Sequence, residues 1–183
     1  MNKGTKVLLI GAGIWYLGEG LLGPLLVYFS EDIGGTILDL SWAVAAYLVV
    51  YGLLSIWFGR MSDTRLDKGR LMVWGYGLNA MFTFGYLLVT NSTTLLIVQA
   101  GLGVAAAMAT PTWNALFDEF SDSSVNGTSW GIAEGMQSII TGITLVLGAL
   151  VVSYFSFKTL FIAMGCIQVL ATVYQARILY VQK

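Results

Sequence analysis

Long apolar runs dominate this sequence and limit what it can fold into. Six of them follow one another, at about 7–29, 37–58, 71–90, 94–117, 128–155 and 157–180. A bilayer core of about 30 Å needs roughly 20 apolar residues per helix. The runs are continuous rather than alternating, which argues against transmembrane β-strands. The sequence therefore predicts an all-α integral membrane protein, with six transmembrane helices in one domain over residues 1–183.

Composition excludes several other classes of protein. Of the 183 residues 10% are charged and 57% hydrophobic, the net charge is −1, histidine is absent, and Cys166 is the single cysteine. A soluble domain has about 25% charged residues. No disulfide framework, His/Cys metal site or Ser-His-Asp or Cys-His catalytic group can be built from these residues. We expect a lipid bilayer around the chain, and no enzyme activity, cofactor, metal or nucleic-acid partner.

The basic residues indicate the orientation of the chain. With the N-terminus inside, one side of the membrane receives Lys3, Lys6, Arg60, Arg65, Lys68, Arg70, Arg177 and Lys183, and the other receives Lys158. Loops rich in lysine and arginine stay on the cytoplasmic side. The first run is too long for a signal peptide and lacks a cleavage site. The sequence predicts both termini in the cytoplasm and the protein in the plasma (inner) membrane.

The two prolines have similar surroundings, which suggests an internal repeat. Pro24 and Pro111 are each followed, after nearly the same interval, by a Ser-Trp pair that ends at Trp42 or Trp130. The predicted repeats are about 7–90 and 94–180. Because each holds three spans, the second copy would be inverted, as in many secondary transporters. The alternative is chance similarity between apolar strings. Both prolines are expected to kink their helices.

Glu19 lies in the middle of the first run, where an ionisable group is costly. The sequence places no lysine or arginine at that depth to pair with it. Hydrocarbon favours the neutral, protonated form of a carboxyl group. Glu19 is therefore a candidate proton carrier. The alternative is a protonated carboxyl that holds two helices together by hydrogen bonds.

Polar and aromatic stripes indicate a cavity for a solute. In the fifth run, acidic, amide and hydroxyl side chains recur at intervals of three and four, which places them on one helical face. Similar stripes occur in the second and fourth runs, and less clearly in the third, from Tyr76 through Asn79 to Tyr86. For the aromatic residues, ordinary packing is the alternative. The predicted pathway residues are Trp15, Glu19, Tyr47, Tyr51, Gln99, Asn114, Glu134, Gln137 and Thr141.

The loop after the second run carries a family signature. It reads Gly59-Arg60-Met61-Ser62-Asp63, then Arg65, then Gly69-Arg70. This resembles the cytoplasmic loop of the major facilitator superfamily (MFS), in which Gly-x-x-x-Asp precedes basic residues and a Gly-basic pair. The Gly23-Pro24 end of the first run and the fourth run resemble the same family, although Gln99 stands where members often have arginine. The Gly-Pro antiporter motif of the fifth helix is absent. The resemblance covers the whole chain, as the N-terminal six-helix half of a transporter.

The resemblance implies a central cavity between two such halves. We expect a half-size secondary transporter that works as a parallel homodimer and moves a small neutral or cationic organic solute by alternating access, with proton coupling as an addition. The residues expected to form a conformational latch are Gly59, Asp63, Arg65, Gly69 and Arg70. Asp63 would reach the partner's fifth helix, and the arginines would pair with acids such as Glu119. An ordinary solvated loop is the alternative for the latch. For the function, the alternatives are a truncated or engineered half, one member of a heteromeric pair, or a non-transporting scaffold.

Overall fold

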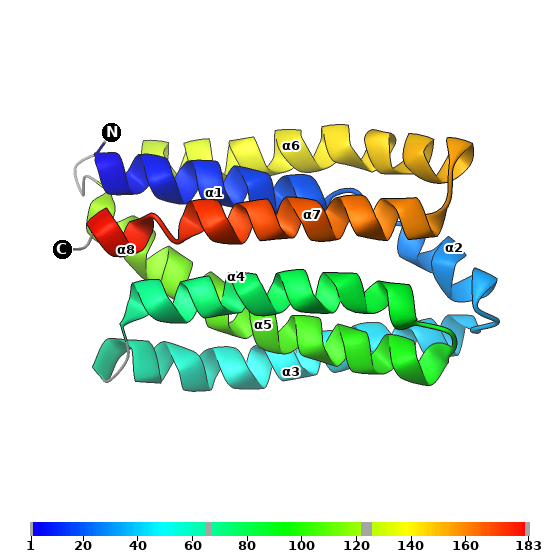
Figure 1. Ribbon diagram of the computed structural model, residues 1–183. Coiled ribbons are helices and arrows are strands. Elements are labelled where there is room, and N and C mark those ends of the chain that lie inside the picture. Colours follow the sequence, from blue (N-terminus) through cyan, green and yellow to red (C-terminus); the bar gives the residue numbers. More distant parts are fainter. Residues whose placement is uncertain (1, 65–66, 122–125, 182–183) are drawn as a thin grey trace.

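The computed structural model describes residues 2–64, 67–121 and 126–181, and within these ranges all regular elements are helices (Figure 1). This confirms the all-helical prediction. The elements are α1 (Lys3–Glu19), α2 (Leu25–Asp32), α3 (Ile37–Thr64), α4 (Lys68–Gly85), the 3-10 helix η1 (Tyr86–Leu88), α5 (Ser92–Phe120), α6 (Asn126–Tyr154), α7 (Phe157–Gln175) and α8 (Ile178–Val181).

Short polar segments between the apolar runs begin the next helix. The side chain of Asp67 accepts a hydrogen bond from the backbone N–H of Arg70 and caps α4. Asn91 and Thr94 cap α5 by reciprocal bonds, and Ser156 accepts from the backbone N–H of Thr159 at the start of α7. Such caps satisfy backbone donors that the helix itself leaves free.

The first apolar run differs from the predicted continuous span. Two helices, α1 and α2, are separated by a turn at residues 20–24. Gly23 has φ +33°, a conformation that side chains disfavour, and Pro24 is the N-cap of α2. Pro24 thus lies at the boundary between two helices and does not bend one long helix. Pro111, by contrast, lies inside α5.

Five segments of the described chain are long and apolar enough to cross a membrane. They are Ile37–Ser62, Lys68–Leu88, Ser92–Phe120, Gly127–Tyr154 and Phe157–Val181. With 17 residues, α1 is shorter than these. The predicted six spans and their inverted repeat are therefore not confirmed.

The helices lie side by side in an elongated bundle (Figure 1). Helix α5 packs on α3 and α4, α7 joins α4 to α1, and α1 contacts α6. A Cβ at Gly103 would lie 2.6 Å from the carbonyl oxygen of Tyr47, so α5 and α3 meet backbone to backbone. Small residues allow such close contact between membrane helices. Few residues of the α3 and α6 spans are buried, whereas about half of those in α4 and α5 are.

Both chain ends lie at one end of the bundle, which we call the terminal end; α2 lies at the other, the far end (Figure 1). The ends of α3 and α5 and the starts of α4 and α6 are also at the terminal end, and Lys3, Arg60, Lys68 and Arg177 lie in or next to the helix ends there. Lys158, at the start of α7, is at the far end. The basic residues named here are thus concentrated at the terminal end, while Arg65 and Lys183 lie outside the described residues.

Candidate functional site

A cleft of about 600 Å³ opens between α1 and α6 on one side and α3 and α5 on the other. Most predicted pathway residues line it: Trp15, Glu19, Tyr47, Tyr51, Gln99, Gln137 and Thr141. Helix α4 and η1 contribute Asn79 and Tyr86, and α5 adds Thr110. Residues from five different segments of the sequence thus form one mildly polar, aromatic surface. Among the described residues that line it, Glu19 is the one with a carboxyl group, and none is a lysine or an arginine.

Glu19 is the last residue of α1 and is held by amides from two other helices. Its Oε1 accepts a hydrogen bond from Nδ2 of Asn79 on α4 at 2.8 Å and from Nε2 of Gln168 on α7 at 3.3 Å. The same Gln168 nitrogen lies 3.1 Å from the carbonyl oxygen of Trp15. Neutral donors replace water at the carboxyl group, but they supply no positive charge. A negative charge is also disfavoured at the C-terminus of a helix. The arrangement suits a carboxyl group that gains and loses a proton.

Aromatic side chains give the cleft its apolar walls. The rings of Tyr47 and Tyr51 are stacked, with centroids 6.1 Å apart and planes 5° apart. Trp15 packs against Tyr76 with centroids 4.4 Å apart. Flat rings of this kind can hold an apolar or cationic solute by stacking and by attraction to the ring face.

Gln99 occupies the position where the resemblance suggested an arginine. Its Nε2 donates a hydrogen bond to the hydroxyl of Tyr86 at 3.2 Å, and its side chain is buried. An uncharged amide bonded to a phenol supplies no cation to Glu19. The residue therefore belongs to the cleft wall, and it does not form an intramembrane ion pair.

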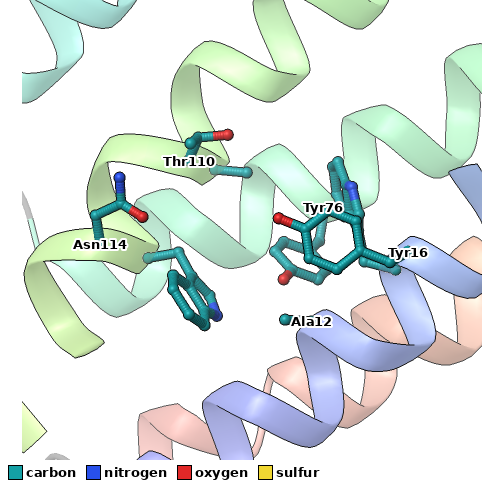
Figure 2. Close-up of a pocket in the computed structure, with 8 residues that line it drawn as sticks. Ala12, Tyr16, Tyr76, Thr110 and Asn114 are labelled. Carbon is teal, nitrogen blue, oxygen red and sulfur yellow. The ribbon is translucent and has the colours of Figure 1, made fainter. Parts of the chain in front are cut away.

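Two predicted pathway residues lie outside the cleft. Asn114 lines a smaller neighbouring cavity of about 40 Å³, with Ala12, Trp15, Tyr16, Tyr76, Ala109, Thr110 and Trp113 (Figure 2). Glu134 lies on the exposed surface of α6, one turn nearer the terminal end than Gln137, and lines neither space. Thr144, on the same face of α6, is buried, and its hydroxyl donates a hydrogen bond to the carbonyl oxygen of Ile140 at 2.9 Å. The stripe of α6 therefore meets three different environments.

The predicted latch is described in part. Gly59 lies in the last turns of α3, and Gly69 is buried at the start of α4. Arg70 is 3.8 Å from its neighbour Asp67, while Glu119 pairs with Lys68. Of the acids expected to pair with the arginines, Glu119 thus pairs with Lys68 instead, and the acid near Arg70 is Asp67 of the same turn. The Asp63 side chain and Arg65 lie outside the described residues.

Sequence reasoning missed Gln168 and undervalued Asn79. Asn79 belongs to the polar stripe of the third run, which seemed a less clear cavity wall. Gln168 is one of two amides in the sixth run, with Gln175, and both are fully buried. An amide at membrane depth is itself a signal, because it needs a hydrogen-bonding partner there. Its distance of 149 positions from Glu19 along the chain hid the pairing.

Comparison with known proteins identifies similar sequences. The family model described as Major Facilitator Superfamily matches residues 8–183. The Quinolone resistance protein NorA of Staphylococcus aureus is 28% identical over 131 residues, which are 72% of this chain and 34% of that protein. The "Uncharacterized MFS-type transporter MJ1560" of Methanocaldococcus jannaschii is 22% identical over 173 residues, which are 94% of this chain and 45% of that protein. The chain thus spans about a third to a half of the length of these relatives.

Proposed function

The chain belongs to the major facilitator superfamily, a family of transporters and not of enzymes, and we propose that it moves a small neutral or cationic organic solute across the membrane by alternating access. The observation that carries this proposal is the cleft in which Glu19 is hydrogen-bonded between aromatic walls. A carboxyl group with no basic residue beside it favours a cation over an anion. The rings favour a solute with an apolar or aromatic body.

We propose six membrane crossings, arranged as two inverted repeats of three. Both chain ends at one end of the bundle require an even number of crossings, and α1 with α2 supplies the crossing that the five long segments leave out. The concentration of lysine and arginine at the terminal end supports a cytoplasmic location for both termini in the plasma (inner) membrane.

A second six-helix unit would close the cleft. The cleft is open along one side, and the α3 and α6 helices beside it expose apolar residues such as Leu48, Leu53, Ile139 and Val146. A second copy, parallel and related by a two-fold axis along the membrane normal, would cover this face in a homodimer. A second half of a longer chain would cover it in the same way. Gly59, Asp63, Arg65, Gly69 and Arg70 would then form the latch at the terminal end.

Proton coupling through Glu19 completes the proposal. When the Glu19 carboxyl group is protonated it carries no charge, so moving the helix through apolar surroundings costs less energy. When it is ionised, it attracts a cationic solute into the cleft. Protonation of Glu19 would therefore change how strongly the cleft binds a cationic solute, which couples proton binding to solute binding.

The test is uptake into proteoliposomes under an imposed pH gradient. The panel would hold neutral and cationic aromatic solutes and a quinolone, because the name of the Staphylococcus aureus relative links it to quinolone resistance. Glu19→Gln should abolish the effect of the pH gradient. Glu31→Gln, at the exposed end of α2, is the matched control and should keep it. Uptake that is equal in Glu19→Gln and wild type, and insensitive to pH, would reject the coupling.

The mass of the protein in nanodiscs tests the second unit separately. A dimer that transports supports the homodimer. A monomer without transport indicates that a different second half is needed. A dimer that transports no solute of the panel, and whose cleft stays closed to water-soluble probes, would favour the non-transporting scaffold.

A further inference from the structure

A small cavity adjoins the cleft on the side of the terminal end. Its volume is about 40 Å³, and Trp15, Tyr16 and Thr110 line both this cavity and the cleft. On α1, Tyr16 lies one helical turn before Glu19. On α4, Tyr76 lies one turn before Asn79, the hydrogen-bond partner of Glu19. A buried water needs roughly 10–15 Å³ of such space, so the cavity has room for about three.

Several hydroxyl groups border this cavity. Figure 2 shows the hydroxyl groups of Tyr16 and Tyr76 pointing into the same space, with Thr110 and Asn114 across from them. Within residues 2–64, 67–121 and 126–181, no hydrogen bond engages the hydroxyl of Tyr76, although this side chain is only 4% exposed. The hydroxyl oxygen itself is not enclosed, so it faces space in which a water can supply the missing hydrogen bond. Thr112 differs, because its hydroxyl bonds the carbonyl of Met108 at 2.6 Å.

We propose that this cavity holds ordered water and gives Glu19 its access to protons from the terminal end. The proposal rests on the proposed function, in which Glu19 carries the proton. Glu19 releases its proton to a water in the cleft. Each water or hydroxyl along Tyr16, Tyr76 and Thr110 then accepts one proton and passes another on, so that none of them keeps a charge. At Asn114, which is exposed, the proton leaves to solvent.

The surroundings of Glu19 leave the proton no competing acceptor on the way. Asn79 and Gln168 donate to the carboxyl from α4 and α7. The other polar groups that line the cleft are Tyr47 and Tyr51 of α3, Tyr86 of η1, Gln99 of α5, and Gln137 and Thr141 of α6. None of the described side chains that line either space is a lysine, an arginine or a second acid.

Trp113 joins α5 to α1 beside the cavity. Its Nε1 donates a hydrogen bond to the carbonyl oxygen of Leu8 at 3.2 Å, which joins α5 to α1 across the cavity. Its ring is stacked on Phe117, with centroids 4.8 Å apart. The hydrogen bond from Trp113 to Leu8 ties α5 to α1 next to the polar groups.

Hydrogen–deuterium exchange of the Glu19 carboxyl tests the route without any substrate. Infrared spectroscopy of the full chain in lipid vesicles, moved into heavy water, would follow the carboxyl band that Glu19→Gln removes. Tyr76→Phe and Thr110→Val should each slow the exchange about tenfold, the factor that corresponds to one lost hydrogen bond. Thr112→Val, whose hydroxyl faces its own helix, should leave the rate unchanged.

Exchange as fast as in wild type in both cavity variants would overturn the proposal, as would a wild-type protein without an exchanging Glu19 band. The outcome is separate from that of the proposed function. Slowed exchange together with absent solute uptake would retain the water route and reject transport. Normal uptake with unslowed exchange would do the reverse.

A cysteine pair tests the water itself. In a Cys166→Ser background, Ala109→Cys places a thiol in the cavity wall, and Ala107→Cys places one at a fully buried position that lines neither space. A small, water-soluble methanethiosulfonate should modify the first thiol about tenfold faster or more, because the reaction needs a hydrated thiolate. Equal rates at the two positions would overturn a hydrated cavity.

Discussion

Glu19 on α1 and Glu134 on α6 both lie inside apolar stretches of sequence, yet their surroundings differ. Glu19 is bonded by amides from two neighbouring helices and faces the cleft. Glu134 is exposed on the surface of α6. The glycine beside each acid shows the same contrast: a Cβ at Gly18 would lie 2.7 Å from Nε2 of Gln168, whereas a Cβ at Gly135 would have nothing within 4 Å.

The two regions therefore differ in where their partners come from. The polar groups near Glu19 are bonded by this chain, whereas the surface around Glu134 has to be covered by lipid or by another protein unit. The hydrogen bonds that the Glu19 carboxyl accepts come from this chain itself, from Asn79 on α4 and Gln168 on α7, although the Oε1 atom of Gln168 is buried without a partner among the described residues.

The outer surface of α6 has no packing partner among the described residues of this chain. Glu134, glycines with nothing within 4 Å of a Cβ, and apolar residues such as Ile139 and Leu150 are exposed there. Lipid or a second unit must complete that surface, and the proposed second unit would do so.

The largest effect is expected from filling the two glycine positions. Gly18→Leu should destabilise the protein by about 3 kcal/mol, because the new side chain separates α1 from α7 and displaces Gln168 from Glu19. Gly135→Leu should change stability by less than about 1 kcal/mol, since the position is open and leucine favours a helix over glycine. Thermal unfolding in detergent, followed by tryptophan fluorescence, measures both. Equal losses in the two variants would show that the contrast is not real.

A smaller effect is expected from removing one amide in each region. Gln168→Leu should cost about 1.5 kcal/mol, because the Glu19 carboxyl and the Trp15 carbonyl lose a buried donor. Gln137→Leu, at a half-buried position of α6, should stay within about 0.5 kcal/mol of wild type. Denaturant unfolding at constant detergent concentration gives both values. A larger loss for Gln137→Leu than for Gln168→Leu would contradict the account.

The same contrast explains which features the sequence could predict. Apolar length placed the helices, and the polar stripes identified most of the cleft, because both depend on composition and periodicity within one segment. The break between α1 and α2 was missed, since hydropathy does not report the φ of Gly23. The pairing of Gln168 with Glu19 and the outward position of Glu134 were missed for one reason. Which helix lies next to a polar face depends on tertiary packing, and a single stripe carries no information on it.

The smallest effect is expected at the ion pair between Lys68 of α4 and Glu119 of α5, at the terminal end. Its side chains are 23% and 51% exposed, so solvent screens the attraction. Lys68→Met should cost about 0.5 kcal/mol, and the cost should vanish in high salt. The loss in Gln168→Leu should persist at the same salt concentration, since that site is buried and uncharged donors hold it. Unfolding of both variants at low and high salt therefore distinguishes the surface ion pair from the buried contacts of Glu19. If the loss in Gln168→Leu also fell at high salt, Glu19 would be in contact with bulk solvent instead.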